Sequence, residues 1–276
     1  MKRPEGDMSL SLFRKIVDEV RNFPLRTMYL QLFGEPLLNP NVFEMIRYAK
    51  ERTVYEVVMN TNATLLDENS ASRVVTSGLD RIVLSFEGSS RETYEQIRRN
   101  ARYESTLKNI QGFLRTKKAT GSKKPFTILQ TIRMKPTARE VDLFLARFED
   151  LPVDRLFVGD FDNWANQVEA ITTLQTDRNA LRQAFPCADP WRGIAVCWDG
   201  RVIPCCRDFD ARCTLGDLND STLLEIWNGV NMVELRQSHV SSIEGAFPCR
   251  QCNQTTPFAS PVGIMFSALR RMVGRI

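Results

Sequence analysis

Cysteines are the residues of this chain whose type and spacing most directly indicate chemistry. Four of them follow the pattern Cys187-x17-Cys205-x43-Cys249-x2-Cys252. The last two form a tight chelating pair, and the other two could complete four thiolates around one metal centre. Gathered thiolates suit either a tetrahedral zinc ion or a [4Fe–4S] cluster, and spacing alone does not separate the two.

The other three cysteines and the single histidine give weaker signals. Cys197 and Cys213 are interpreted as buried thiols without a ligand role. Cys206 follows Cys205 directly, and adjacent side chains point to different sides of the backbone, so only one of the two is expected to be a ligand. His239 is not expected to bind metal, because a complete cysteine set is present.

A second chemical signal is the segment GEPLLNP, residues 34–40, which follows a predicted strand at residues 27–33. Loops at the carboxyl ends of strands are where α/β barrels bind ligands. Gly34 permits close backbone approach, and Pro36 holds Glu35 extended. The tripeptide GEP alone is also compatible with a simple turn. Its position directly after a predicted strand favours a ligand-binding loop.

The elements that must position these residues alternate between strands and helices. Apolar spacing predicts strands at residues 27–33, 55–60, 81–86, 126–132 and 155–158, and helices at 9–20, 40–50, 65–76, 89–97, 107–118 and 139–148. Asp7 or Ser9 is the predicted cap of the first helix, and Gly78 closes the third. Ser89 and Glu92 form a predicted capping box.

This alternation predicts an α/β fold, a partial (β/α)6 TIM-like barrel over residues 1–160. The series begins with a helix, so we expect the first strand of the barrel to be missing, which leaves a neighbouring strand with an unpaired edge. A connector with a polar helix is predicted for residues 161–186. A small cysteine-rich domain that needs a metal or disulfide staple follows at 187–252. An amphipathic helix is predicted for 253–276.

Composition excludes several classes of protein. Hydrophobic residues make up 43% and charged residues 25% of the chain, which is typical of a globular protein. The net charge of +4 is small and its basic residues are scattered, so no nucleic-acid partner is expected. No apolar stretch is long enough to span a membrane. Without an export signal, the cysteines indicate a cytoplasmic protein in which metal ligation is commoner than disulfides.

The cysteine-rich region resembles a known family. The segment CADPWRGIAVCWDGRVIPCCRDFD is similar to the opening of a SPASM domain, in which a cysteine is followed by Gly-x4-Cys. The segments LGDLNDSTLLEIWNG and PCRQC continue the resemblance. Because no cysteine follows Cys252, the region resembles the shortened, twitch-type version with one auxiliary [4Fe–4S] cluster. The resemblance implies the ligands Cys187, Cys205, Cys249 and Cys252.

The N-terminal half is similar to the S-adenosylmethionine (SAM)-binding half of radical SAM enzymes. Gly34, Glu35 and Pro36 resemble the GEP motif, whose backbone meets the amino group of SAM. NTNATLL and SFEG resemble two further strand ends of that family, although Glu87 replaces the usual aspartate. The resemblance implies cofactor-binding roles for these residues: Gly34, Glu35, Pro36, Asn60, Asn62, Ser85, Glu87 and Arg98. For Arg98, a solvated helix charge is the alternative interpretation.

Relatives in this family hold a catalytic cluster on three cysteines, CxxxCxxC, in the loop after the first strand. Its fourth iron position is left for SAM, and electron transfer cleaves SAM to a 5′-deoxyadenosyl radical. MKRPEGDMS resembles the sequence that follows this loop, and the first 186 residues contain no cysteine. We therefore expect an N-terminally truncated chain that does not cleave SAM by itself.

The resemblance thus implies a parent enzyme that modifies a peptide or small metabolite by radical chemistry, assisted by an auxiliary [4Fe–4S] cluster. Its expected reductant is a flavodoxin or ferredoxin. The alternative is a non-catalytic binding module, stapled by zinc or an iron–sulfur cluster, on a degenerate SAM-binding scaffold. Neither the substrate nor the reaction outcome follows from a fold that many chemistries share.

Overall fold

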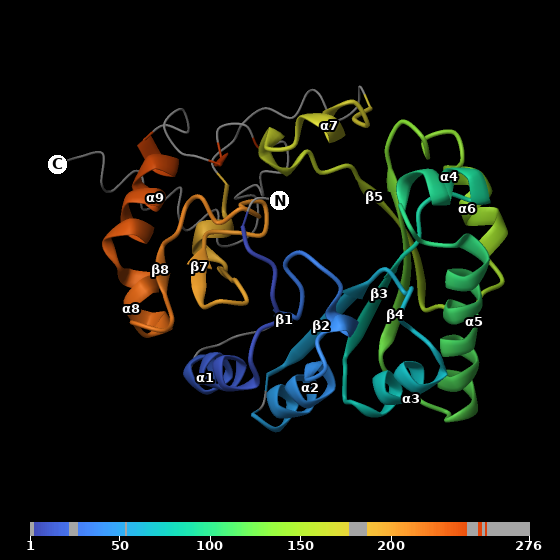
Figure 1. Ribbon diagram of the computed structural model, residues 1–276, viewed down its shortest axis with the longest axis horizontal. Helices are drawn as coiled ribbons and strands as arrows, with labels where there is room; N and C mark the ends of the chain where they lie inside the picture. Colours follow the sequence, from blue (N-terminus) through green and yellow to red (C-terminus); the bar gives the residue numbers. More distant parts are fainter. Residues whose placement is uncertain are drawn as a thin grey trace. The chain divides into compact units, whose positions relative to one another are not determined.

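A computed structural model describes most of the chain, namely residues 3–21, 27–52, 54–176, 187–241, 248–249 and 252 (Figure 1). It divides into two compact units. The first, called the sheet unit, is Asp7–Phe161. The second, called the cysteine unit, combines Met1–Gly6 with Asp162–Ile276. The predicted helix at residues 253–276 lies outside the described residues.

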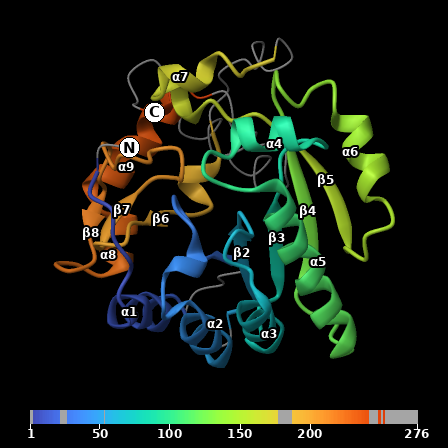
Figure 2. The ribbon, with the colours of Figure 1, turned by 45° about the vertical axis from the view of Figure 1, so that its right-hand side comes forward.

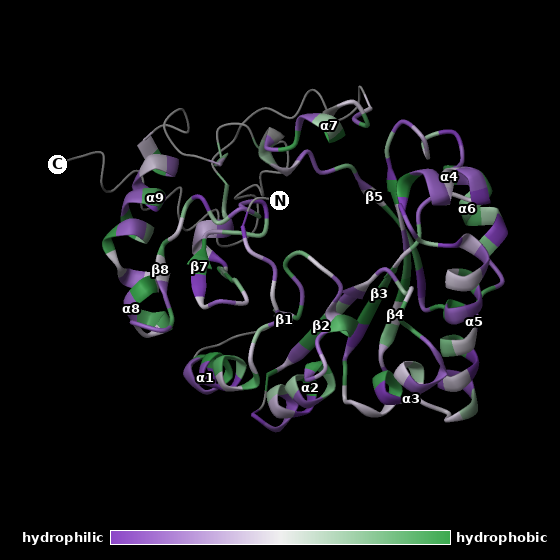
Figure 3. Cartoon of the chain, viewed as in Figure 1, coloured by the Kyte–Doolittle hydropathy of each residue, from purple (hydrophilic) through white to green (hydrophobic). Residues whose placement is uncertain are grey.

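The sheet unit is built on five strands that are all parallel to their neighbours and follow chain order. The strands are β1 (Thr27–Tyr29), β2 (Glu56–Thr61), β3 (Arg81–Ser85), β4 (Phe126–Arg133) and β5 (Arg155–Asp160). Val57, Val58 and Met59 of β2 are all buried, as expected for parallel strands covered on both faces. Figure 3 shows hydrophobic residues running along β3 and β4. The predicted α/β class is confirmed.

Helices precede the first strand and connect the later ones, and they form an outer layer on the sheet (Figures 1 and 2). They are α1 (Leu10–Val20), η1 (Pro36–Leu38), α2 (Val42–Glu51), α3 (Glu68–Thr76), α4 (Arg91–Ile97), α5 (Tyr103–Ala119) and α6 (Val141–Phe148). α1 begins as predicted, with the Ser9 hydroxyl accepting a hydrogen bond from the Leu12 N–H at 3.2 Å. Its buried residues recur every three or four positions, so the apolar stripe faces the core.

The first strand ends earlier than predicted. The Leu30 N–H still donates to the Val58 carbonyl at 2.9 Å. The Asn60 N–H of β2, however, donates to the side-chain oxygen of Gln31 at 3.1 Å. The Gln31 side chain therefore replaces a backbone carbonyl of β1 as the acceptor for this N–H. The backbone leaves the sheet after Tyr29 and continues into the loop.

The start of α4 also differs from the prediction. Its N-cap is Ser90, whose hydroxyl accepts from the Thr93 N–H at 3.2 Å, and not Ser89. Ser89 instead donates its N–H to the carboxylate of Glu140 at 2.7 Å. Glu140 is distant in sequence, so it acts as a cap that no local capping-box pattern can indicate.

An aromatic cluster supports the segment after β3. The Phe86 ring stacks on Tyr94 with ring centroids 4.6 Å apart, and it lies 5.2 Å from the ring of Tyr103. All three side chains are fully buried. Aromatic packing of this kind stabilises the loop beyond the simple burial of apolar area. The end of β3 is therefore held on a rigid base.

The cysteine unit contains a small antiparallel sheet with strand order β6-β7-β8. Its described elements are η2 (Trp164–Asn166), α7 (Glu169–Thr172), η4 (Asp189–Trp191), β6 (Ala195–Val196), β7 (Arg201–Ile203), β8 (Gly216–Asp217), α8 (Leu223–Asn228) and α9 (Val230–Ser241). The polar helix predicted within residues 161–186 is broken into two short elements over the described residues. Trp164 and Ala165 have positive φ angles of 50° and 53°, which interrupt a right-handed helix.

The N-terminal segment packs within the cysteine unit, which the sequence does not indicate. The Trp198 indole N–H donates to the Pro4 carbonyl at 3.0 Å. A Cβ placed on Gly6 would lie 2.7 Å from the Trp198 ring, so only glycine fits beneath this indole.

In the described part of the chain, no helix is both long enough and apolar enough to cross a membrane.

Candidate cofactor and cluster sites

The first candidate site lies at the carboxyl edge of the parallel sheet. Parallel strands bring their carboxyl ends to one edge, so the residues that follow β1, β2 and β3 gather there. Of the predicted cofactor residues, Asn60 and Ser85 lie at the carboxyl ends of the neighbouring strands β2 and β3, and Gly34 lies in the loop that follows β1. Ser85 is the last residue of β3 and pairs in register with Gln130 of β4.

Glu35 fastens the loop after β1 to the end of β2. Its carboxylate accepts hydrogen bonds from the Thr61 hydroxyl at 2.6 Å and from the Asn62 N–H at 2.8 Å. It also accepts from the Leu37 N–H at 3.2 Å, which caps the short helix η1. The Glu35 side chain therefore fixes the loop.

Gly34 gives this loop an exposed backbone. Its φ of +113° is in a region that favours glycine, and a Cβ placed there would meet no atom within 4 Å. Pro36 is buried and begins η1. The backbone at Gly34 is therefore accessible, and its role toward a ligand stays a prediction.

The two asparagines at the end of β2 differ in their environment. The side-chain oxygen of Asn62 accepts from the Thr64 N–H at 2.9 Å and from the Thr64 hydroxyl at 2.6 Å, which forms a local turn. The side-chain oxygen of Asn60 is buried and has no hydrogen-bond partner in the described structure. A buried acceptor without a donor is costly, so Asn60 is complementary to a ligand that offers an N–H or O–H.

Glu87 and Arg98 form a bidentate ion pair. The guanidinium Nε and Nη2 lie 2.5 Å and 2.7 Å from the two carboxylate oxygens. The Glu87 side chain is 3% exposed, whereas that of Arg98 is 33% exposed. Burial lowers the pKa of Arg98, but its hydrogen bond and charge interaction with Glu87, helped by the charge of Glu35, raise this pKa overall. Arg98 is thus held by Glu87 and is not a freely solvated helix charge.

The second candidate site is a small cavity of about 20 Å³ in the cysteine unit. Its lining residues include all four predicted ligands, together with one acid, one arginine and one proline: Cys187, Asp189, Cys205, Arg207, Pro248, Cys249 and Cys252. Cys206 is exposed and does not line this cavity. Within the described residues, no three His, Cys, Asp or Glu side chains are already arranged as a metal-binding group.

Electrostatics couple the thiols around this cavity. Burial, reinforced by the charge of Cys206, raises the pKa of Cys205 to about 12. Burial also raises the pKa of Cys249, and the charges of Cys205, Cys187 and Cys252 add to this effect. Buried thiolates that repel one another need a bound cation to be stable, so this donor set fits a metal centre.

Arg207 is a residue of this site that the sequence analysis does not single out. Its guanidinium Nε lies 2.9 Å from Asp162, and its Nη1 lies 3.4 Å from Asp189. Burial lowers the pKa of Arg207, but the charges of Asp162, Cys206 and Cys252 raise it overall. Its only signal in the sequence is a position two residues after Cys205. The lone His239 does not line the cavity.

Two family models match the regions of the chain that contain the candidate sites. Residues 187–253 match the SPASM iron–sulfur cluster-binding domain, and residues 1–122 match the radical SAM superfamily. Together these matches span well over half of the sequence. The chain belongs to the radical SAM superfamily and has a SPASM-type iron–sulfur domain. Between zinc and iron–sulfur, which spacing leaves open, the match favours iron–sulfur.

Similar proteins act on varied substrates. The chain is 22% identical to the tungsten-containing aldehyde ferredoxin oxidoreductase cofactor-modifying protein of Pyrococcus furiosus, over 81% of this chain and 73% of that protein. It is 24% identical to the PqqA peptide cyclase of Gluconobacter oxydans, over 80% of this chain and 67% of that protein. A shorter match, 31% identical, to an AdoMet-dependent heme synthase of Methanosarcina barkeri covers 39% of this chain and 31% of that protein.

Solved structures share the fold. Native anSMEcpe with bound AdoMet has a TM-score of 0.63 and 17% identity, over 93% of this chain and 82% of that chain. SuiB of Streptococcus suis bound to precursor peptide SuiA has a TM-score of 0.66 and 13% identity, over 92% of this chain and 64% of that chain. At these identities the likeness shows the fold alone.

Proposed function

We propose that this chain forms the SAM-binding sheet and the auxiliary-cluster domain of a radical SAM enzyme that modifies a peptide or a small metabolite. The main support is the carboxyl edge of the sheet, where the exposed backbone of Gly34 and the buried, unpartnered oxygen of Asn60 lie at adjacent strand ends. Such groups fit a ligand that has both hydrogen-bond donors and acceptors.

The residues of this edge would each have a distinct role toward SAM. Backbone groups of residues 34–36 would bind its amino group, and Asn60 would accept a hydrogen bond. Arg98 uses two of its five N–H groups on Glu87, so it can still donate to a carboxylate. When SAM is bound beside a reduced cluster, it supplies radical chemistry for hydrogen abstraction.

In the cysteine unit, Cys187, Cys205, Cys249 and Cys252 would hold the auxiliary [4Fe–4S] cluster. Arg207 would then contribute a positive charge at the rim of the same cavity. Charge and hydrogen bonding close to an iron–sulfur cluster alter its reduction potential. A flavodoxin or ferredoxin is the proposed reductant, and a peptide substrate is suggested by the names of the peptide cyclase and of SuiB with its bound peptide.

A second candidate function is a non-catalytic binding module. It is favoured by the absence of any cysteine ahead of Cys187 in these 276 residues. Both functions predict SAM binding by this chain, but only an enzyme that holds a radical-generating cluster releases 5′-deoxyadenosine. We expect none from these residues after anaerobic iron–sulfur reconstitution, and its formation would reject the second candidate.

SAM binding by the full chain tests the proposed site directly. Isothermal titration calorimetry should show at least about 10-fold weaker binding for Gly34→Val and for Asn60→Ala, because each loses a contact worth about 1.4 kcal/mol or more. Gly121→Val is a matched control, since Gly121 also has a positive φ with open space around it, but it lies in the loop that enters β4 at the opposite edge. Asn69→Ala, on the exposed surface of α3, is the control for Asn60. Equal SAM affinity in Gly34→Val and Gly121→Val would count against the site.

A further inference from the structure

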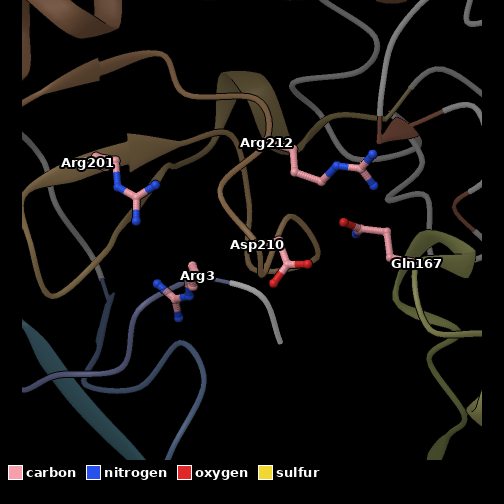
Figure 4. A pocket seen from close by; sticks show the side chains of 5 residues that line it. All are labelled: Arg3, Gln167, Arg201, Asp210 and Arg212. Atoms are coloured by element: carbon pink, nitrogen blue, oxygen red, sulfur yellow. The ribbon is translucent and has the colours of Figure 1, made fainter.

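The cysteine unit contains a second, larger cavity of about 260 Å³ (Figure 4). It has no lining residue in common with the cysteine-lined cavity. Its lining residues include three arginines, one acid and one amide: Arg3, Gln167, Arg201, Asp210 and Arg212. A space of this size, close to that of small ligand pockets, suits a molecule with few non-hydrogen atoms.

Arg3 is the feature of this cavity that most needs explanation. The residue is only 8% exposed, and its Nε and Nη1 are buried without a hydrogen-bond partner in the described structure. A guanidinium stays charged at any ordinary pH, so burying it unpaired is strongly unfavourable. The contacts of Trp198 with Pro4 and Gly6 nevertheless hold this segment in place. An anion that reaches this guanidinium would supply acceptors for both orphan donors.

Gln167 provides a second, complementary group. Its side-chain nitrogen donates to the Trp164 carbonyl at 3.1 Å and to the Arg207 carbonyl at 2.5 Å. These two bonds fix which end of the amide is the oxygen. That oxygen is buried and has no partner in the described structure. The cavity therefore offers a buried acceptor as well as buried cationic donors.

The charges of the lining select the kind of anion. The lining residues include three arginines and one acid, so they have a positive excess even though Arg201 also pairs with Asp199 at 2.7 Å. Asp210 adds a negative charge that opposes a doubly charged anion such as phosphate. A planar carboxylate matches the fork of a guanidinium and has only one charge.

We propose that this cavity binds a carboxylate that has a hydrogen-bond donor on the adjacent carbon, as in an α-hydroxy acid, an α-amino acid or the C-terminal residue of a peptide. The carboxylate binds Arg3, and the neighbouring O–H or N–H donates to the Gln167 oxygen. This inference does not depend on the proposed SAM site, so either can fail without the other.

Calorimetry on the full chain tests the ligand class. Glycolate should bind at least about 10-fold more tightly than acetate, because acetate lacks the hydroxyl that donates to Gln167. N-acetylglycine imitates a peptide C-terminus, so tighter binding than glycolate identifies a peptide end as the source, and weaker binding identifies a free acid. Glycolate and acetate of equal affinity, or inorganic phosphate that binds more tightly than every carboxylate, would overturn the proposal.

Variants of two arginines test the location. Arg3→Gln should abolish glycolate binding, whereas Arg192→Gln, an exposed arginine of the same unit that does not line the cavity, should leave it unchanged. Without ligand, Arg3→Gln should melt at the same temperature as the parent chain or higher, because an unpaired buried charge is removed. A lower melting temperature would show that Arg3 has a structural partner and would reject the anion site.

Discussion

Buried carboxylates in the sheet unit are held by several hydrogen bonds each. Glu87 binds Arg98 through both of its oxygens, and Glu35 accepts from the Thr61 hydroxyl and the Asn62 N–H. Where the family has aspartate, the extra methylene of Glu87 lengthens the reach of its carboxylate toward Arg98. These side chains position the loops of the carboxyl edge rather than react themselves.

His239 of α9 gives a prediction at the same scale. It is buried, with Nδ1 2.9 Å from the Leu235 carbonyl and the ring edge-on to Trp191. Burial lowers the pKa of His239 below the ordinary 6.5, and the Leu235 carbonyl and the charge of Asp189 oppose this only in part. As the pH falls below about 6.5, the unfolded chain binds a proton that the folded chain resists. The stability from His239 is thus complete above this pH and is lost as the pH falls toward the lowered pKa.

Urea unfolding of the metal-free chain between about pH 7 and pH 5 measures this effect, because histidine is the side chain that ordinarily titrates in this range. The free energy of unfolding should fall with a slope of up to about 1.4 kcal/mol per pH unit. His239→Gln should flatten that slope, since the chain has no other histidine. An unchanged slope in the variant would assign the titration to another group.

At the scale of elements, loops depend on side chains from distant segments. The Gln31 side chain ends the pairing of β1, and Trp198 of the cysteine unit packs on Gly6. Glu140, just before α6, accepts hydrogen bonds from Ser89, Ser90 and Thr93 at the start of α4. These contacts orient the ends of strands and helices at the candidate sites.

Replacing Glu140 tests how α4 is capped. Burial raises the pKa of Glu140, but its hydrogen bonds with Thr93, Ser89 and Ser90 lower this pKa overall, so the ionised carboxylate is stabilised by folding. Glu140→Gln should therefore reduce the free energy of unfolding at neutral pH by about 1–3 kcal/mol, as measured in urea. Glu92→Gln is the control, because Glu92 is exposed and belongs to the local capping box that the sequence suggests. A larger loss of unfolding free energy in Glu92→Gln than in Glu140→Gln would show that the local capping box, and not Glu140, caps α4.

At the scale of the whole molecule, a parallel sheet and a cysteine-lined cavity occur in separate compact units of one chain. The sheet gathers polar loops because all its strands run in one direction. The cysteine unit has only short strands, so a bound cluster would contribute much of its stability. Cofactor binding and cluster binding can therefore be measured independently.

Iron loading provides the prediction at this scale. Anaerobic reconstitution of the full chain should yield about four iron atoms and about four sulfides per chain, as expected for one [4Fe–4S] cluster. Cys205→Ala and Cys249→Ala should each lose most of this iron, whereas Cys206→Ala should retain it because Cys206 does not line the cavity. Elemental and sulfide analysis would report the result. Retained iron in Cys205→Ala together with lost iron in Cys206→Ala would exchange the two ligand assignments.

Features that depend on local order can be predicted from the sequence. Apolar periodicity indicated the alternating strands and helices, and Ser9 and Gly78 marked helix ends through hydrogen bonding and φ preferences of neighbouring residues. The spacing of Cys249 and Cys252 indicated a chelating pair, and GEP after a strand indicated a ligand loop. Each of these signals lies within a few residues of the chain.

Features that depend on contacts between distant residues become visible only in the folded chain. Glu140 caps α4 from about 50 positions away, and Arg207 joins the cysteine cavity through ion pairs with Asp162 and Asp189. Arg3 and Gln167 line one cavity although more than half of the chain separates them. A charged side chain has no periodicity that reveals its partner, because that partner is fixed by how the packed elements meet in space.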